Sequence, residues 1–447
     1  MSANRKDISP GVDYYLAEFA RVERDLAGGR ALETLRNDSL KAFSRAGFPH
    51  KKVEDWKYTD VGEIESTRFE AAESAADVTA AELAPYLPEG LDAHRLVVVD
   101  GHVVAGLSDL ADLPDGVRVE GLAARLSAAE DAPRAVGSAV NGYASPFTDM
   151  NTAFMSDGLY LETAPDAVLD KPLHLLVVAS GRHERSMAQV RNVLRLGENS
   201  ECALIEHYVG LGDKTYFTNA VTEVEAGPGA KLNRVRIQQE GDGGYHVASF
   251  NAHQQRDSWI VDHAVDLGGK LARTDTNSRL DAEGAGIELY GVYAPTGEQH
   301  VDNHTRVDHA KPHGTSREAY KGVLAGKGRG VFNGKVIVHK DAQKTDSEQS
   351  SDALLLSKRA EVDAKPELEI YADDVKCAHG STVGQLDEDA VFYLQSRGID
   401  EEGARAILTY SFADELISRI KPEPLRRYLE NALLAKLPAG SRYAGLA

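Results

Sequence analysis

Residues 259–281 read WIVDHAVDLGGKLARTDTNSRLD, and this stretch decides the expected fold. It holds two runs whose side chains alternate with a period of two, separated by the turn residues Gly268 and Gly269. Because successive side chains of a strand point to opposite faces, we expect each run to have one small or branched face and one polar face. The same alternation recurs at residues 300–308 and 367–371.

Strands of this kind follow one another across residues 154–383 without helical segments between them. Such a series predicts a sandwich, a barrel or a parallel β-helix. The small faces contain mostly Ala, Thr, Ser, Asn and Val, which suit the narrow core of a β-helix because stacked rungs bring like positions together. We therefore expect a mainly β fold with a parallel β-helix core. The irregular spacing of the runs does not give a rung length.

Both ends of the chain show helical spacing instead. Residues 12–47 are expected to be helical, Asp387 is placed to cap a helix over residues 388–396, and residues 401–419 and 425–436 continue the helical pattern. The helix expected over residues 401–419 places these residues on one apolar stripe: Ala404, Ile407, Leu408, Phe412, Leu416 and Ile420. The predicted domains are an N-terminal helical and mixed domain (1–152), the β-helix core (153–383) and a C-terminal helical domain (384–447).

Composition excludes several classes of protein. The 447 residues carry 50 Lys and Arg against 70 Asp and Glu, a formal net charge of −20. A surface this acidic repels nucleic-acid backbones and anionic lipid, so we expect neither a nucleic-acid partner nor a membrane partner. The N-terminal residues lead into no apolar signal core, and Cys202 and Cys377 are too few for a disulfide framework. These features predict a cytoplasmic protein.

Four histidines and two aspartates gather in HVDNHTRVDHAKPH, residues 300–313. Imidazoles and carboxylates can hold Zn²⁺ or Fe²⁺, so a metal-dependent enzyme using His300, His304 and His309 is one alternative. Strand alternation places His300, Asp302 and His304 on one face, which we expect to be the solvated outside of a rung.

A second candidate site consists of two residues, Cys377 and His379. On a strand both side chains project from the same face, with β-carbons roughly 7 Å apart. They could share one soft or borderline metal with ligands from elsewhere, act as a nucleophilic Cys–His pair, or be a half-buried thiol beside an ordinary histidine. The sequence contains no GxxxxGK[ST] and no Gly-x-Ser-x-Gly motif, which predicts that the chain is not an enzyme.

The C-terminal half contains several further elements in one order: GVFNGKVIV (residues 330–338), AQKTDSEQ (342–349), LLLS (354–357), PELEI (366–370), DDVKCAHG (373–380) and FYLxxRG (392–398). Together they resemble the SufB/SufD family of the SUF system of iron–sulfur cluster assembly. The element PHKKVEDWKYT (49–59) is typical of the SufD members, whereas residues 63–142 carry little that can be matched.

The resemblance implies a right-handed parallel β-helix between helical ends, in a complex with SufB-like and SufC-like (ATPase) subunits. It implies a non-catalytic scaffold that contributes to iron acquisition and to cluster formation at the interface with SufB. It also assigns a ligand role for the transient, shared cluster to His379, with Cys377 at the accompanying position. The C-terminal helices within residues 399–447 are expected to dock the ATPase, so removing these residues should abolish its co-purification. The alternative from another class is a β-helix enzyme acting on polysaccharide.

Two points stay open in the sequence: whether the complex uses a flavin, and whether a homodimer forms without SufB. Terminal rungs of a β-helix expose unpaired backbone groups, so self-pairing is physically reasonable.

Overall fold

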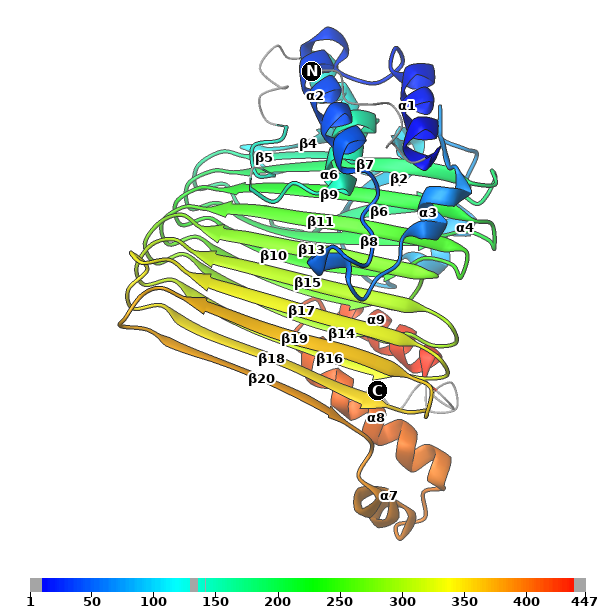
Figure 1. Cartoon of the computed structure of the whole chain (residues 1–447), viewed down its shortest axis with the longest axis vertical. Helices are drawn as coiled ribbons and strands as arrows, with labels where there is room; N and C mark the ends of the chain where they lie inside the picture. The colour runs from blue at the N-terminus through cyan, green and yellow to red at the C-terminus, as the bar shows by residue number, and fades with distance from the viewer. Residues whose placement is uncertain (1–9, 129–135, 141, 438–447) are drawn as a thin grey trace.

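The chain coils into two long parallel sheets that face each other (Figure 1). The computed structural model describes residues 10–128, 136–140 and 142–437. From β5 onward the odd-numbered strands build one sheet, sheet A, and the even-numbered strands build the other, sheet B, so the chain crosses from sheet to sheet at every turn. Neighbouring strands from β5 to β20 are parallel within each sheet. The predicted parallel β-helix core is confirmed.

Sheet A contains β4 (Val117–Gly121), β5 (Leu159–Thr163), β7 (Ser186–Leu196), β9 (Tyr216–Ala226), β11 (Gly244–Gln254), β13 (Leu271–Leu280), β15 (His300–His309), β17 (Arg329–Val338) and β19 (Glu361–Ile370), with β1 (Glu70–Ala71) beside β7. Sheet B contains β3 (His102–Val103), β2 (His94–Val99), β6 (Leu173–Ala179), β8 (Glu201–Gly210), β10 (Lys231–Gln239), β12 (Trp259–Asp266), β14 (Gly286–Tyr293), β16 (Thr315–Leu324), β18 (Asp346–Leu355) and β20 (Lys376–Gly384).

The length of a rung varies along the solenoid. Tyr245 pairs with Leu271 after 26 residues, whereas Arg329 pairs with Glu361 after 32. The difference lies in the turns between strands. One such turn contains Gly268, where a Cβ would lie 2.2 Å from the backbone oxygen of Glu240, so only glycine fits. This variation explains why the sequence shows strands but no fixed period.

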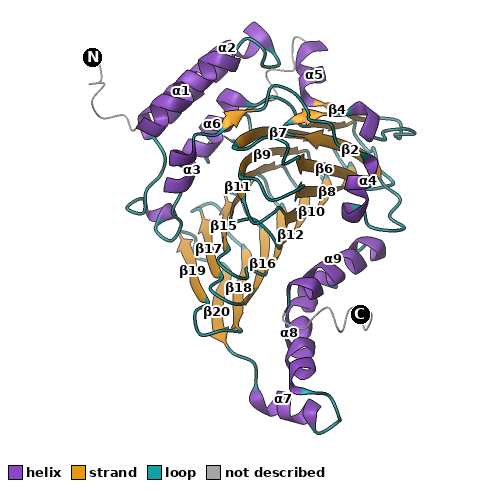
Figure 2. Cartoon of the chain, turned by 90° about the vertical axis from the view of Figure 1, so that its right-hand side faces the viewer, coloured by secondary structure: helices purple, strands orange, loops and turns teal. Residues whose placement is uncertain are grey.

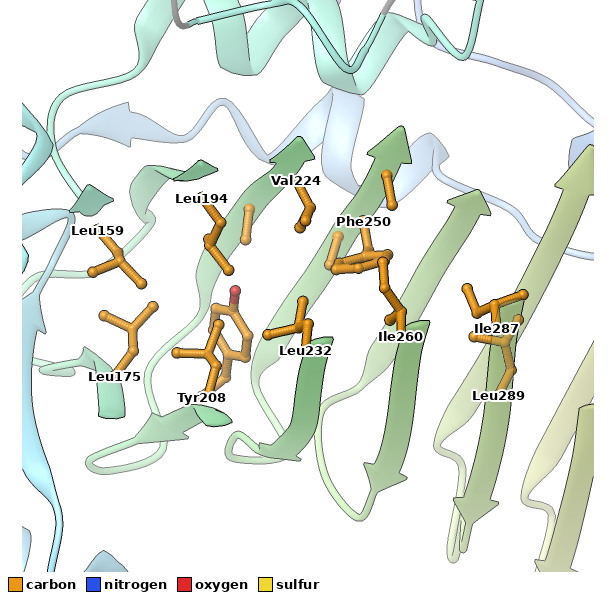
Figure 3. Packing of buried hydrophobic residues seen from close by; sticks show 14 of the residues in the cluster. Leu159, Leu175, Leu194, Tyr208, Val224, Leu232, Phe250, Ile260, Ile287 and Leu289 are labelled. Atoms are coloured by element: carbon orange, nitrogen blue, oxygen red, sulfur yellow. The ribbon is translucent and has the colours of Figure 1, made fainter. Parts of the chain in front are cut away.

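The hydrophobic core lies between the two sheets. Leu194, Val224 and Phe250 of sheet A point toward Tyr208 and Leu232 of sheet B (Figure 3). Toward the C-terminus the inner face becomes smaller and more polar, as predicted for β13. Its inward residues are Ala272, Thr274, Thr276, Ser278 and Leu280, all buried.

The expectation that polar faces point outward is wrong in β12. Asp262 and Asp266 are 1% and 2% exposed and lie inside the solenoid. They are paired with two arginines of the neighbouring strand β10, at 2.8 Å from Arg234 and 2.6 Å from Arg236. Buried carboxylates persist where cations neutralise them, so the stacked rung supplies what the alternation pattern cannot show.

The N-terminal region adds helices and the first short strands. Its helices are α1 (Pro10–Val22), α2 (Gly29–Ala46), η1 (Glu54–Trp56), α3 (Gly62–Thr67), α4 (Ala80–Leu83), η2 (Ala84–Tyr86), η3 (Ala105–Leu107), α5 (Leu122–Ala128) and α6 (Pro146–Phe154). Aromatic rings of α1, α2 and α6, among them Tyr15, Phe43 and Phe147, pack together and against Phe217 on the outer face of sheet A. The helical pattern before Gly47 is confirmed, and the Gly47 amide caps α2.

The C-terminal region forms α7 (Glu388–Gln395), α8 (Glu401–Ile417) and α9 (Glu423–Lys436). Helices α8 and α9 lie along the outer face of sheet B, whereas α7 extends beyond β20 (Figure 2). Asp387 caps α7 as predicted. The predicted stripe of α8 is partly wrong, because Ile407, Leu408 and Phe412 are only half-buried while Ala413 is fully buried. Among the described residues, no helix is long and apolar enough to cross a bilayer.

Candidate functional site at the open end of the solenoid

The solenoid ends at β19 and β20, which are the last strands of the two sheets (Figure 1). We call this pair of strands the open end. Every residue of β20 except Cys377 and Gly384 is exposed, and no residue of β19 is fully buried. Ile370 and Val383 are 42% and 49% exposed. Strand edges of this kind carry unpaired N–H and C=O groups and favour pairing with another chain.

Cys377 and His379 lie on the same face of β20, as the sequence predicts. In the parallel register Cys377 pairs with Ser347 and His379 with Gln349 of β18. Ser347 and Gln349 are buried inside the solenoid, at 1% and 3% exposure, so their partners on β20 face the mouth of the open end. The sulfur is half-buried and the imidazole is exposed.

The surroundings of Cys377 favour the neutral thiol. Partial burial raises the pKa of Cys377, and the carboxylate of Asp346 adds to this, while a hydrogen bond from the Ser347 backbone acts in the opposite direction. A nucleophilic cysteine needs a lowered pKa, so the raised pKa of Cys377 does not favour the alternative of a Cys–His nucleophile. A metal ion that binds the sulfur would displace the proton, because the thiolate is the ligand.

Sequence reasoning missed the side chains directly behind this pair. Behind Cys377, the Ser316 hydroxyl donates to Ser347 at 2.8 Å, and His309 Nε2 lies 2.9 Å from Ser316. Behind His379, the Gln349 amide donates to Glu318 at 3.2 Å. The contacts of Ser347 with Ser316 and of Gln349 with Glu318 join residues 31 positions apart, so only the rung register could have found them.

The outer face of β15 is not solvated, contrary to expectation. Asp302 is 1% exposed and accepts hydrogen bonds from Arg273 at 2.9 Å and from Thr59. His300 lies 2.9 Å from the Thr59 hydroxyl, and His304 lies 3.0 Å from Asp302. The N-terminal segment thus covers this face, and local alternation cannot predict a cover that lies about 240 residues away.

The remaining histidines of the 300–313 cluster point elsewhere. His309 lies inside the solenoid against Ser316, and burial lowers its pKa to about 4. His313 sits in a turn with a φ of 60°. In the parts of the chain that the structure describes, no three His, Cys, Asp or Glu side chains are arranged to hold a metal. The alternative of a metal-dependent enzyme using His300, His304 and His309 therefore has no support in the geometry.

The covering segment is anchored by an aromatic contact. The Arg273 guanidinium lies 3.7 Å from the ring centroid of Trp56, and its terminal nitrogen donates to the backbone oxygen of Asp55 at 2.6 Å. A buried arginine between an indole and carboxylates combines cation–π attraction with ion pairing. Trp56 and Thr59, both within the 49–59 element, therefore fix the N-terminal region to sheet A.

The fold and its open end define a class of protein: a parallel β-helix whose last strand presents a thiol and an imidazole. A family model described as "SUF system FeS cluster assembly, SufBD core domain" matches residues 177–412, and one described as "SufBD protein N-terminal region" matches residues 12–175. The chain belongs to the SufBD family of the SUF system of iron–sulfur cluster assembly. The resemblance seen in the sequence is confirmed.

Relatives are similar over most of their length. The chain is 32% identical over 412 residues to "Iron-sulfur cluster assembly protein SufD" of Escherichia coli (strain K12), which covers 90% of this chain and 92% of the relative. It is 33% identical over 384 residues to an "Iron-sulfur cluster assembly SufBD family protein" of Synechocystis sp. This alignment covers 83% of this chain and 84% of the relative. It is 30% identical over 418 residues to "Protein ABCI7, chloroplastic" of Arabidopsis thaliana. This alignment covers 90% of this chain and 85% of the relative.

Proposed function

We propose that this chain is a non-catalytic scaffold subunit of an iron–sulfur cluster assembly complex, which contributes to iron acquisition and to cluster formation where it meets a SufB-like subunit. The observation that carries the proposal is the open end. It presents a sulfur ligand and a nitrogen ligand beside unpaired strand edges. Thiolate and imidazole both suit iron, so these residues fit the cargo of the family.

Two ligands do not complete an iron or cluster site, so the proposal requires ligands from a partner. The exposed edges of β19 and β20 offer the place where such a partner joins, because a second β-helix can extend both sheets. A second copy of this chain could occupy the same edges when a SufB-like subunit is absent. The cluster is then transient and shared, and a flavin enters only through the assembled complex.

We propose that the contact with a SufC-like ATPase lies on α7, just before the 399–447 region expected from the sequence. Helices α8 and α9 bury Leu416, Leu425 and Leu429 against sheet B, so their apolar faces are already occupied. By contrast, Phe392 and Tyr393 of α7 are 70% and 56% exposed. Replacing both with aspartate should abolish co-purification of the ATPase and leave the solenoid folded. Full retention of the ATPase would contradict this placement.

The scaffold proposal is tested by co-expression with SufB-like and SufC-like subunits, followed by anaerobic purification and measurement of iron and sulfide per complex. His379→Ala should lower iron by more than half while subunit stoichiometry stays unchanged. Cys377→Ala should have a smaller effect. His183→Ala, which changes an exposed histidine in the turn before β7, is the matched control and should retain wild-type iron.

Unchanged iron in His379→Ala, with all subunits present, would remove His379 from the site. Loss of iron in His183→Ala as well would show that the loss is nonspecific.

A further inference from the structure

We propose that Gln349 is a positioning residue for His379, and that Glu318 holds it in place. In this arrangement the Nδ1–H of His379 donates to Oε1 of Gln349, and the lone pair on Nε2 faces out of the open end toward iron. The inference rests on the proposed role of His379 and adds what fixes the orientation of its ring.

The register stacks the three residues in one inward-facing file. Glu318 of β16 pairs with Gln349 of β18, which pairs with His379 of β20. Adjacent strands lie about 4.8 Å apart, so each side chain in the file is within reach of the next. Glu318 and Gln349 are each 3% exposed, whereas His379 is exposed at the mouth.

Gln349 has one satisfied and one unsatisfied end. Its Nε2 donates to Glu318 Oε2 at 3.2 Å, and the Thr305 hydroxyl donates to the same oxygen at 2.6 Å. Its Oε1 is buried and has no hydrogen-bond partner among the described residues. An unpaired buried acceptor costs about 1–3 kcal/mol, so a donor within reach is favoured.

The opposite sheet holds the Gln349 side chain in position. A Cβ added at Gly334 of β17 would lie 2.2 Å from Gln349 Nε2, so the glycine leaves the space that the amide fills. With Nε2 fixed on Glu318, the amide oxygen is directed away from that contact. Rotation of the exposed His379 side chain is then sufficient to form the hydrogen bond, and such rotations take nanoseconds or less.

Among the described residues, an unpaired buried acceptor lies directly behind His379 but not directly behind Cys377. Ser347, which lies behind Cys377, already accepts from Ser316 at 2.8 Å. Of the two side chains directly behind the candidate ligands, only Gln349 keeps a buried acceptor without a partner. Histidine ligands in proteins usually donate their second N–H to an oxygen, which fixes the tautomer and the ring orientation, and losing that oxygen costs 10–100-fold in metal affinity.

The test reads the tautomer of His379 directly, in the full-length chain without iron. Nitrogen-15 NMR of histidine-labelled protein, with the His379 signals assigned by their absence in His379→Ala, distinguishes Nδ1–H from Nε2–H. We expect the Nδ1–H form to dominate at a pH where the ring is neutral. A free imidazole favours Nε2–H, so a wild-type His379 with that preference would overturn the proposal without any variant.

Variants then show whether Gln349 is the cause. Gln349→Leu should return His379 to the Nε2–H form and lower iron in the assembled complex about tenfold, whereas Gln349→Glu keeps an acceptor and should keep the Nδ1–H form. Ser347→Ala, the matched change in the neighbouring file, should not alter the tautomer. A tautomer unchanged by Gln349→Leu would overturn the proposal.

The ligand role of His379 and its contact with Gln349 can be refuted separately. Iron that is insensitive to His379→Ala would refute the ligand role even if the Gln349 contact is present. An Nε2–H tautomer would refute the contact even if iron depends on His379.

Discussion

The two ends of the solenoid differ in how they are finished. At the N-terminal end, short antiparallel strands lie at the edges: β4 pairs with β5, and β3 pairs with β2. Four of the five residues of β5 and five of the six residues of β2 are buried, and α5 packs beside β4 and β5. At the C-terminal end, no described residue covers β19 and β20 in this way, and most residues of β20 are exposed.

Under the proposed function, the N-terminal end serves stability and the open end serves interaction. Both ends are built from the same alternating strands, so strand pattern does not distinguish them. The N-terminal end satisfies its edges within the chain, by antiparallel pairing and helices, as soluble proteins do to prevent edge pairing. Among the strands that the structure describes, none pairs with the outer edges of β19 and β20, beside Cys377 and His379. We therefore expect substitutions to act on folding at one end and on assembly at the other.

The largest expected effect is on stability in the N-terminal region, where helices cover the outer face of the first rungs of sheet A. Phe147 of α6 is 2% exposed and packs against Trp56, Phe48 and Phe217, with ring centroids 5.2 to 6.0 Å apart. Phe147→Ala should lower the free energy of unfolding by about 3–5 kcal/mol, because it leaves a cavity in a closed aromatic cluster. Denaturant unfolding of the isolated chain measures this. A loss below about 1 kcal/mol would show that the covering helices contribute little.

The next largest expected effect is a pH dependence of stability, caused by Glu318 in the polar interior near the open end. Burial raises the pKa of Glu318 to about 7 from 4.5, and its partners are the neutral side chains of Thr305 and Gln349. The folded state therefore holds the proton more tightly than the unfolded state. The stability that this proton contributes is full below about pH 4.5 and is lost as the pH rises through 7.

Glu318→Gln removes this titration while keeping a side chain of similar size. The variant should gain stability relative to wild type between pH 5 and pH 8, by roughly 3 kcal/mol. Unfolding midpoints of both proteins at each pH measure the difference. A constant difference across this range would show that Glu318 does not change its protonation state there.

A smaller effect is expected on assembly through the free edge of β20. The Lys376 amide donates to the backbone oxygen of Thr345, in the turn before β18. Donors alternate along a strand, so the Ser381 N–H faces the free edge. Ser381→Pro removes that donor and should weaken association with a SufB-like subunit or a second copy at least about tenfold, or 1.4 kcal/mol. Sedimentation of the mixed subunits measures it, with Ser381→Ala as control. Equal association of both variants would show that this edge is not used.

The smallest effect is expected from apolar truncation at the open end. Val383→Ala should change the free energy of unfolding of the isolated chain by less than about 0.5 kcal/mol, because this side chain is 49% exposed. The same change should matter more in the complex, where a partner covers it. A large loss of stability in the isolated chain would mean that the open end is already covered. Val383 would then stabilise the fold as the buried Phe147 does.

Much of the fold could be predicted because its signals are local. Alternation gave the strands at 259–266 and 271–280, and Asp387 gave the start of α7, since both depend on neighbours along the chain. The shared face of Cys377 and His379 follows from the same period of two. Local signals failed where a distant segment decides burial, as for Asp302, which Thr59 and Arg273 cover.

The sequence by itself determined the strands, the helical ends, the Cys377–His379 pair and the family. Only the tertiary structure decided which rung lies beside which, and therefore that Gln349 and Glu318 stand behind His379. The physical reason is that side-chain direction along a strand has a fixed period of two. The register between rungs depends instead on turns of unequal length, as the spacings of 26 and 32 residues show.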